Sequence, residues 1–252
     1  MGKASVAARL RVFFDIDGTI LLTDGAGRTA LRVALEAVYG TTGPLDGYTF
    51  HGKTDPQIVL ELMHEAGIEE LEVRRLMPEV WPHYLGRLEQ ELGVRRTAGR
   101  IRLLPGVSEL LAALVSRREI ALGLLTGNIE EGARLKLIAV GLESMFQIGG
   151  FGSDSESRAE IARIAVQRAR AVYGPGVGPV VVIGDTPADV ACARAVDAFA
   201  VAVATGRHDV EELTEAGADV VFKDFSDTAS VLECILSVAR PSGDTVGGNG
   251  RR

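Results

Sequence analysis

The sequence is poor in cysteine and in aromatic residues, and it carries no excess of positive charge. Its 252 residues include two cysteines and 5% aromatic side chains, with a formal net charge of −7. Cys192 and Cys234 form no CxxC pair and both fall within apolar helical patterns, so we expect buried thiols in a reducing compartment. Because neutralising the phosphates of DNA or RNA needs clustered Lys and Arg, the acidic balance argues against a nucleic-acid partner.

Long apolar runs are also absent. The sequence contains no stretch of about 18 apolar residues, so we expect no membrane-spanning helix and no membrane partner. The first residues include basic side chains but no long apolar segment, which argues against a signal peptide and favours a cytoplasmic protein. The 46% hydrophobic and 24% charged residues are typical of a globular chain, and the length predicts about one to two domains.

Short apolar segments alternate with helical patterns over most of the chain. Such alternation predicts an α/β fold, with a doubly wound, mostly parallel sheet and helices on both faces. Strands are expected at 10–16, 120–125, 146–148, 180–184, 198–203 and 219–222. Helices are expected at 27–39, 69–92, 130–140, 158–172, 187–196, 209–216 and 228–238. Two more are expected to begin near Asp55, which can cap the first of them, and near Pro105.

The segment 22–95 interrupts this alternation, because it contains helical patterns but no convincing strand. We therefore predict an inserted all-helical domain at 22–95 and an α/β core domain made of 1–21 and 96–240. Residues 241–252 are rich in glycine and have almost nothing to bury, so a disordered tail is expected.

Polar clusters directly follow three of the predicted strands, at 15–19 (DIDGT), 126–128 (TGN) and 184–189 (GDTPAD). In open α/β sheets, ligands bind outside the carboxyl ends of the strands. We therefore expect the three clusters to converge on one crevice. This shared placement is stronger evidence for a ligand site than any single motif.

The first cluster pairs two carboxylates. Asp15 and Asp17 are two residues apart on a strand and so begin on the same face, while Gly18 permits a sharp turn behind them. Close carboxylates split their pKa values, so that one stays ionised while the other keeps a proton, which suits a nucleophile beside a general acid. The alternative is a turn with solvated aspartates, which the position on a buried strand disfavours.

The second cluster has two interpretations. The Thr126 hydroxyl and the backbone N–H groups ahead of a helix would form an anion site. The simpler alternative is that Asn128 only caps the helix that begins near Ile129.

The third cluster places Asp185 at a strand tip, where it could complete a Mg²⁺ site with Asp15, because hard cations prefer carboxylate oxygens. Helix capping by Thr186 or Asp185 is the alternative, although capping needs only one acid. Asp189 follows one helical turn later and could hold a neighbour of the metal site in place.

The three clusters resemble motifs one, two and four of the haloacid-dehalogenase-like (HAD) hydrolases, and most of all those of the phosphoglycolate-phosphatase-like branch. The stretch 52–58 (GKTDPQI) is also similar to cap sequences of these phosphatases. The resemblance reaches to about residue 238. It implies a Rossmann-like core domain, with a helical cap inserted after the first strand.

The resemblance also implies a role for each matching residue. Asp15 would attack phosphorus to form an aspartyl-phosphate, and Asp17 would protonate the leaving oxygen and then deprotonate the attacking water. Thr126 would hold phosphoryl oxygens. Asp15, the backbone carbonyl of Asp17 and Asp185 would hold Mg²⁺, which would shield the phosphate from the surrounding acids. The neighbouring residues that would bind substrate with them are Gly18, Thr19, Gly127 and Asn128.

Two sets of positive charges remain to be placed. Motif three of the family usually contains a Lys, often followed by Pro, and this sequence has no such pair in that region. Arg158, at the start of a helix, is favoured for that role. The second candidate, Lys136, lies roughly 9 Å along its helix at 1.5 Å per residue, so it is expected to be a solvated charge. In the cap, Arg28, His51 and Lys53 are candidates for substrate contacts, although Lys53 could simply be solvated.

The resemblance therefore implies a Mg²⁺-dependent phosphatase that hydrolyses a small phosphorylated metabolite, a phosphoglycolate-like phosphomonoester. A phosphomutase of the β-phosphoglucomutase type is one alternative, and a non-enzymatic phospho-acceptor domain is another. The cap stretch favours the phosphatase over the mutase. Asp17 and the cap argue against the phospho-acceptor domain, which needs neither.

Overall fold

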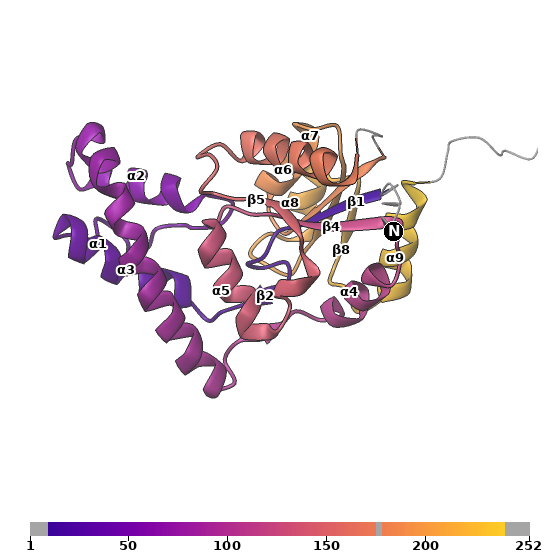
Figure 1. The fold of residues 1–252 in the computed structure, drawn as a ribbon, viewed down its shortest axis with the longest axis horizontal. Coiled ribbons are helices and arrows are strands. Elements are labelled where there is room, and N and C mark those ends of the chain that lie inside the picture. Colours follow the sequence, from indigo (N-terminus) through magenta and orange to yellow (C-terminus); the bar gives the residue numbers. More distant parts are fainter. Residues whose placement is uncertain (1–9, 175–177, 240–252) are drawn as a thin grey trace, which may run out of the picture.

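A computed structural model gives the fold of residues 10–174 and 178–239 (Figure 1). Its centre is a six-stranded sheet in the order β5-β4-β1-β6-β7-β8, and every neighbouring pair runs parallel. The strands are β1 (Leu10–Phe14), β4 (Ile120–Leu125), β5 (Ile148–Gly150), β6 (Val180–Gly184), β7 (Phe199–Val203) and β8 (Val220–Phe222). The predicted α/β class with a parallel sheet is confirmed.

Helices cover both faces of the sheet, because successive side chains of a strand point to opposite sides. Val12 and Phe14 of β1 pack in one apolar core, and Phe13 packs in another. The first core includes side chains of α4 (Val107–Val115), α5 (Glu130–Val140) and α9 (Thr228–Ser237). The second includes side chains of α6 (Arg158–Tyr173), α7 (Pro187–Arg194) and α8 (Val210–Glu215). The sheet is therefore doubly wound, as predicted.

Between β1 and β4 the chain forms a helical lobe, which lies at one end of the molecule in Figure 1. Its helices are α1 (Ala26–Tyr39), α2 (Asp55–Glu65) and α3 (Glu70–Thr97), and they share a third apolar core. Residues 26–97 contain no strand, in line with their periodicity. The domain boundaries at 21/22 and 95/96 stay a prediction, and the tail expected at 241–252 lies outside the described residues.

The two connections to the lobe form a small antiparallel sheet that the sequence analysis missed. It pairs β2 (Leu21–Leu22) with β3 (Arg102–Leu103). Strands of two residues are too short to show a periodicity. The short strand expected at 146–148 is also shifted, since β5 begins at Ile148 and Phe146 instead packs edge-on against Phe14, with ring centroids 6.1 Å apart.

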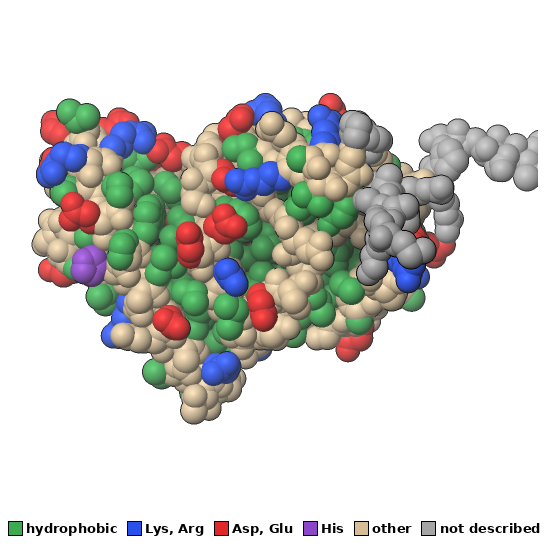
Figure 2. All heavy atoms as spheres, viewed as in Figure 1, with side chains coloured by type: hydrophobic (Ala, Val, Ile, Leu, Met, Phe, Trp, Pro, Cys, Tyr) green, Lys and Arg blue, Asp and Glu red, His purple; other side chains and the backbone are tan. Residues whose placement is uncertain are grey.

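Two local expectations are wrong. Thr54, not Asp55, is the N-cap of α2, and its hydroxyl accepts a hydrogen bond from Gln57 N at 3.2 Å. Cys192 is buried as expected, but Cys234 is only partly buried. None of the described helices is both long and apolar enough to cross a membrane. The face in Figure 2 shows acidic and basic side chains interspersed with apolar ones.

Candidate active site

The three polar clusters meet at one edge of the sheet. They follow β1, β4 and β6, which are neighbours in the order β4-β1-β6, so their carboxyl ends lie side by side. Asp15, Thr126 and Asp185 are all buried there. The convergence expected from the sequence is therefore present, and it brings acids from distant parts of the chain together.

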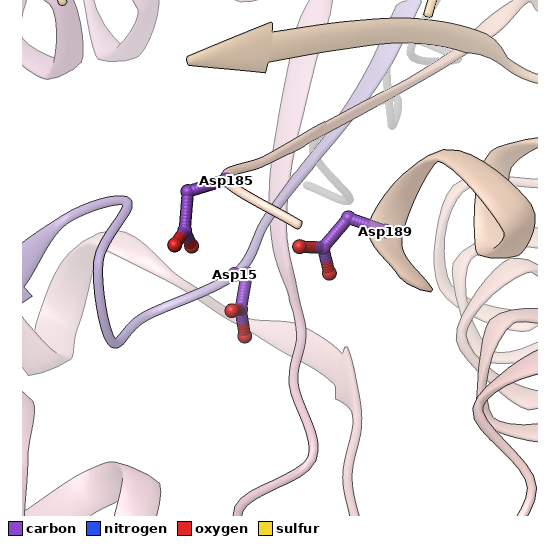
Figure 3. Close-up of side chains that lie close together, drawn as sticks. All are labelled: Asp15, Asp185 and Asp189. Carbon is purple, nitrogen blue, oxygen red and sulfur yellow. The ribbon is translucent and has the colours of Figure 1, made fainter. Parts of the chain in front are cut away.

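The closest group is an acidic cluster of Asp15, Asp185 and Asp189 (Figure 3). One carboxylate oxygen of each lies within 4.8 Å of the others. Burial raises the pKa of Asp15 to about 7, and Asp189 adds to this rise while Arg158 opposes it. Burial also raises the pKa of Asp185 to about 8, with Asp189 and Asp15 contributing. Three buried acids this close cannot all be ionised without a compensating positive charge.

The donor set of this cluster fits a hard divalent cation. Asp185 Oδ1 accepts a hydrogen bond from the Thr19 hydroxyl at 3.0 Å, but its Oδ2 is buried and has no hydrogen-bond partner within residues 10–174 and 178–239. A buried carboxylate oxygen without a donor is costly, and a cation such as Mg²⁺ would satisfy it. Gly18, at φ +88°, and Gly206 leave room for this carboxylate, because a Cβ at either position would overlap it.

Asp17 lies in a different environment from Asp15, although the two are only two residues apart. Its Oδ2 accepts hydrogen bonds from Asn128 Nδ2 at 2.9 Å and from Lys136 Nζ at 2.5 Å. Lys136 Nζ also donates to Asn128 Oδ1. One carboxylate therefore lies among acids and the other beside a cation, so the two differ in their surroundings although they are close in sequence.

Comparisons with known proteins agree with this arrangement. A family model described as haloacid dehalogenase-like hydrolase matches residues 12–194. The chain is also 34% identical over 170 residues to a phosphoglycolate phosphatase of Synechococcus elongatus, a match that covers 67% of this chain and 76% of the relative. This chain belongs to the haloacid dehalogenase-like hydrolases. The expected family and the hydrolase class are thereby confirmed.

Solved structures show the same fold at lower identity. A hydrolase from Pseudomonas syringae is 23% identical with a TM-score of 0.66, covering 89% of this chain and 98% of that one. A putative β-phosphoglucomutase from Bacteroides vulgatus is 18% identical with a TM-score of 0.63, covering 94% of this chain and 92% of that one. At these identities the likeness concerns the fold alone.

In this hydrolase both candidate cations reach the site. Arg158 pairs with Asp189, and its NH2 lies 3.9 Å from Asp15 Oδ1. Lys136 is buried against Asp17, so the expectation of a solvated helix charge was wrong. The distance along the helix axis was a poor guide, because helical side chains tilt towards the N-terminus and a lysine is long enough to reach back along the first turns of α5.

Several residues predicted to bind substrate are engaged within the protein. The Thr19 hydroxyl donates to Asp185, and Asn128 holds Asp17 instead of capping α5. Gly127 lies against the backbone of 53–54, which a Cβ there would overlap, and its carbonyl accepts a hydrogen bond from Asp55 N at 2.7 Å. Asp189 closes a capping box with Thr186 as well as joining the acidic cluster.

The sequence analysis missed the part that Asp55 plays. Its Oδ2 accepts a hydrogen bond at 2.9 Å from Ile129 N, at the start of α5. The helical lobe thus caps the helix of the core domain that carries Lys136. Burial raises the pKa of Asp55 to about 6, although Lys136 and the Ile129 N–H lower it. No local pattern predicts a contact between residues this far apart in the chain.

A cavity of about 570 Å³ lies between the helical lobe and the carboxyl ends of the strands. Its walls include Asp15, Asp17, Thr126, Lys136 and Arg158 from the sheet side. From the lobe side they include Arg28, His51, Lys53, Asp55 and Tyr84. Both the sheet and the helical lobe therefore shape the space beside Asp15 and Asp17.

Lys53 contributes less free charge to this cavity than its type suggests. Its ammonium pairs with Glu61, lies 2.9 Å from the Tyr48 hydroxyl and sits 4.3 Å from the centre of the Tyr48 ring. His51 lies in the same wall, and burial, followed by Arg207, lowers its pKa. Of the three cap candidates, only Arg28 keeps an uncompensated positive charge at the cavity, since no acid partner lies beside it among the described residues.

Proposed function

We propose that this hydrolase is a Mg²⁺-dependent phosphatase that hydrolyses a small organic phosphomonoester through an aspartyl-phosphate on Asp15. The observation that carries the proposal is the buried acidic cluster at the cavity, whose oxygen donors fit a divalent cation that would keep Asp15 ionised for attack. Asp15 lies in a buried acidic cluster that fits a divalent cation, and Asp17 lies beside Lys136. The name of the Synechococcus relative supports phosphoglycolate as the first substrate to assay.

In the first step, a carboxylate oxygen of Asp15 forms a bond to phosphorus while the bond from phosphorus to the ester oxygen breaks. Asp17 gives its proton to the leaving oxygen, so the product departs as a neutral alcohol. In the second step, a water molecule attacks phosphorus and gives a proton to Asp17. Inorganic phosphate leaves and the Asp15 carboxylate is restored.

The remaining polar groups hold the reacting atoms in place. Lys136 and Asn128 fix the Asp17 carboxylate at the cavity wall through the two hydrogen bonds to its Oδ2. Thr126, with backbone N–H groups of its loop, would bind phosphoryl oxygens. Arg158 is held by Asp189 within reach of Asp15, so its guanidinium is placed to neutralise the phosphoryl group.

Asp15, Asp185 and the backbone carbonyl of Asp17 would hold Mg²⁺, with Asp189 close enough to the first two to take part. When bound, Mg²⁺ supplies the positive charge that lets a phosphate dianion approach this acidic cluster. The unpaired, buried Asp185 Oδ2 supports a cation at this place.

The test compares the parent protein with Asp15→Asn, using p-nitrophenyl phosphate and phosphoglycolate with Mg²⁺. We expect the substitution to lower kcat by about 10³-fold or more, because a carboxamide cannot replace the nucleophile. Equal turnover by the two proteins would contradict the proposal. The alternative phosphomutase reaction predicts that ³²P from a sugar phosphate appears in its isomer, whereas the phosphatase releases it as free phosphate.

A further inference from the structure

The positively charged side chains around the cavity differ in how their charge is balanced. Lys53 pairs with Glu61, and Arg100 pairs with Asp24 at 3.1 Å. Lys136 and Arg158 pair with the acids of the catalytic site. Arg102 is exposed on β3. Arg28 is different, because it is only partly exposed and no carboxylate of the described residues lies beside it.

Arg28 is nevertheless held in a fixed orientation. It extends from α1, and its Nη1 and Nη2 donate to the backbone carbonyls of Leu45 and Tyr48, each at 2.7 Å. Its guanidinium carbon lies 4.1 Å from the centre of the Phe50 ring, which is a cation–π distance. The remaining N–H groups have no protein partner among the described residues. An arginine restrained in this way loses little conformational freedom when it binds an anion.

This guanidinium belongs to the same cavity as the reacting acids. Arg28 and Asp15 both line it. His51, which follows Phe50 in the cavity wall, interacts electrostatically with both Arg28 and Asp17. Arg28 therefore lies on the lobe side of the space that a substrate on Asp15 would fill.

We propose that Arg28 forms a second anion-binding subsite, and that the substrates of this enzyme are phosphomonoesters that carry a second anionic group, either a carboxylate or another phosphate. This inference rests on the proposed function, because Asp15 must receive the reacting phosphoryl group. The cavity of about 570 Å³ is within the size range of small-molecule binding sites, so it accommodates substrates longer than phosphoglycolate. A second charge on the substrate would balance the guanidinium.

The test uses two pairs of substrates that differ only in the second anion. 2-Phosphoglycolate is compared with 2-hydroxyethyl phosphate, and glucose 1,6-bisphosphate is compared with glucose 1-phosphate. We expect the parent enzyme to prefer the member with two anionic groups in at least one pair. The expected preference is about 10- to 100-fold in kcat/KM, which is the range for a hydrogen bond between charged groups. The pair that shows the preference identifies the anion as carboxylate or phosphate.

Arg28→Gln is expected to abolish this preference. Its kcat/KM for the member that carries only the phosphate should stay within about threefold of the parent value. Arg32→Gln is the matched control, because Arg32 lies one turn further along α1 and pairs with Asp46 on the surface. It removes the same charge from the same helix and should leave the preference unchanged. If Arg28 only anchors the loop that carries Leu45 and Tyr48, Arg28→Gln will slow both members of a pair equally, and the inference is overturned.

A binding measurement separates this inference from the proposed function. Calorimetry compares three non-hydrolysable ligands on parent and Arg28→Gln proteins: phosphonoacetate and methylenebisphosphonate, which carry a second anion, and 2-hydroxyethylphosphonate, which does not. Tighter binding of phosphonoacetate or methylenebisphosphonate that disappears in Arg28→Gln supports the subsite even if no phosphomonoester is turned over. Equal binding of phosphonoacetate, methylenebisphosphonate and 2-hydroxyethylphosphonate by the parent protein overturns it, whatever the activity assay shows, because neither a carboxylate nor a phosphonate then adds affinity.

Discussion

Removing the charge of Asp55 should stabilise the protein in a pH-dependent way. Asp55 is an acid of the helical lobe that accepts a hydrogen bond from Ile129 N of the core. In Asp55→Asn a carboxamide oxygen remains to accept that hydrogen bond, but the partly buried negative charge is lost. The substitution therefore isolates the cost of ionising this side chain in the folded state.

The magnitude follows from the pKa of Asp55, which burial raises from 3.8 to about 6. An acid with a higher pKa in the folded state binds more protons when folded, so its ionisation lowers stability as the pH rises through this window. Ionisation of Asp55 lowers the free energy of unfolding by about 1.6 kcal/mol at pH 5 and by about 3 kcal/mol at pH 8. We expect the free energy of unfolding of Asp55→Asn to exceed that of the parent by about these amounts.

Urea denaturation at pH 5 and pH 8 measures both values, and the gain should grow by about 1.4 kcal/mol between them. Asp46→Asn is the control, because Asp46 has an 86% exposed side chain and its surface ion pair is worth less than about 1 kcal/mol. Asp55→Ala should be less stable than Asp55→Asn by about 1 kcal/mol at both pH values, because it loses the cap. A gain that does not change with pH would refute the argument.

Three further predictions concern the site. Lys136→Met should lower kcat by about 10²-fold with little change in KM, because Asp17 loses its buried partner; steady-state kinetics with an unchanged kcat would contradict this. Gly18→Ala should raise the Mg²⁺ concentration needed for half-maximal activity, because its Cβ would overlap Asp185, and a magnesium titration identical to that of the parent would count against the cation site. Dialysis against EDTA should abolish turnover and added Mg²⁺ should restore it, whereas persistent activity would exclude the proposed dependence.

The sheet and the acidic cluster were predictable because their causes are local. Strands such as β4 and β6 are continuous apolar runs, which is typical of strands buried on both faces. Asp15 and Asp185 each follow such a strand, and parallel topology then brings their strand ends to one edge. The wall position of Arg28 was also foreseen, although its loop contacts were not.

The features that the sequence did not reveal depend on contacts across the chain or on side-chain direction. The two-residue strands β2 and β3 form only because they pair with each other. Lys136 was placed by its Cα, which ignores the tilt of helical side chains. Asp55 looked like a cap for its own helix, and only the docking of the lobe shows that it caps α5 instead.

The capping of α5 by Asp55 has a consequence for how the two parts of the enzyme communicate. Any outward movement of the lobe that separates Asp55 from Ile129 leaves the Ile129 N–H, at the start of α5, without its acceptor. The same helix carries the lysine that holds Asp17. The position of the Asp17 carboxylate is therefore coupled to the docking of the lobe, so the site is best ordered only while the lobe shields its contents from solvent.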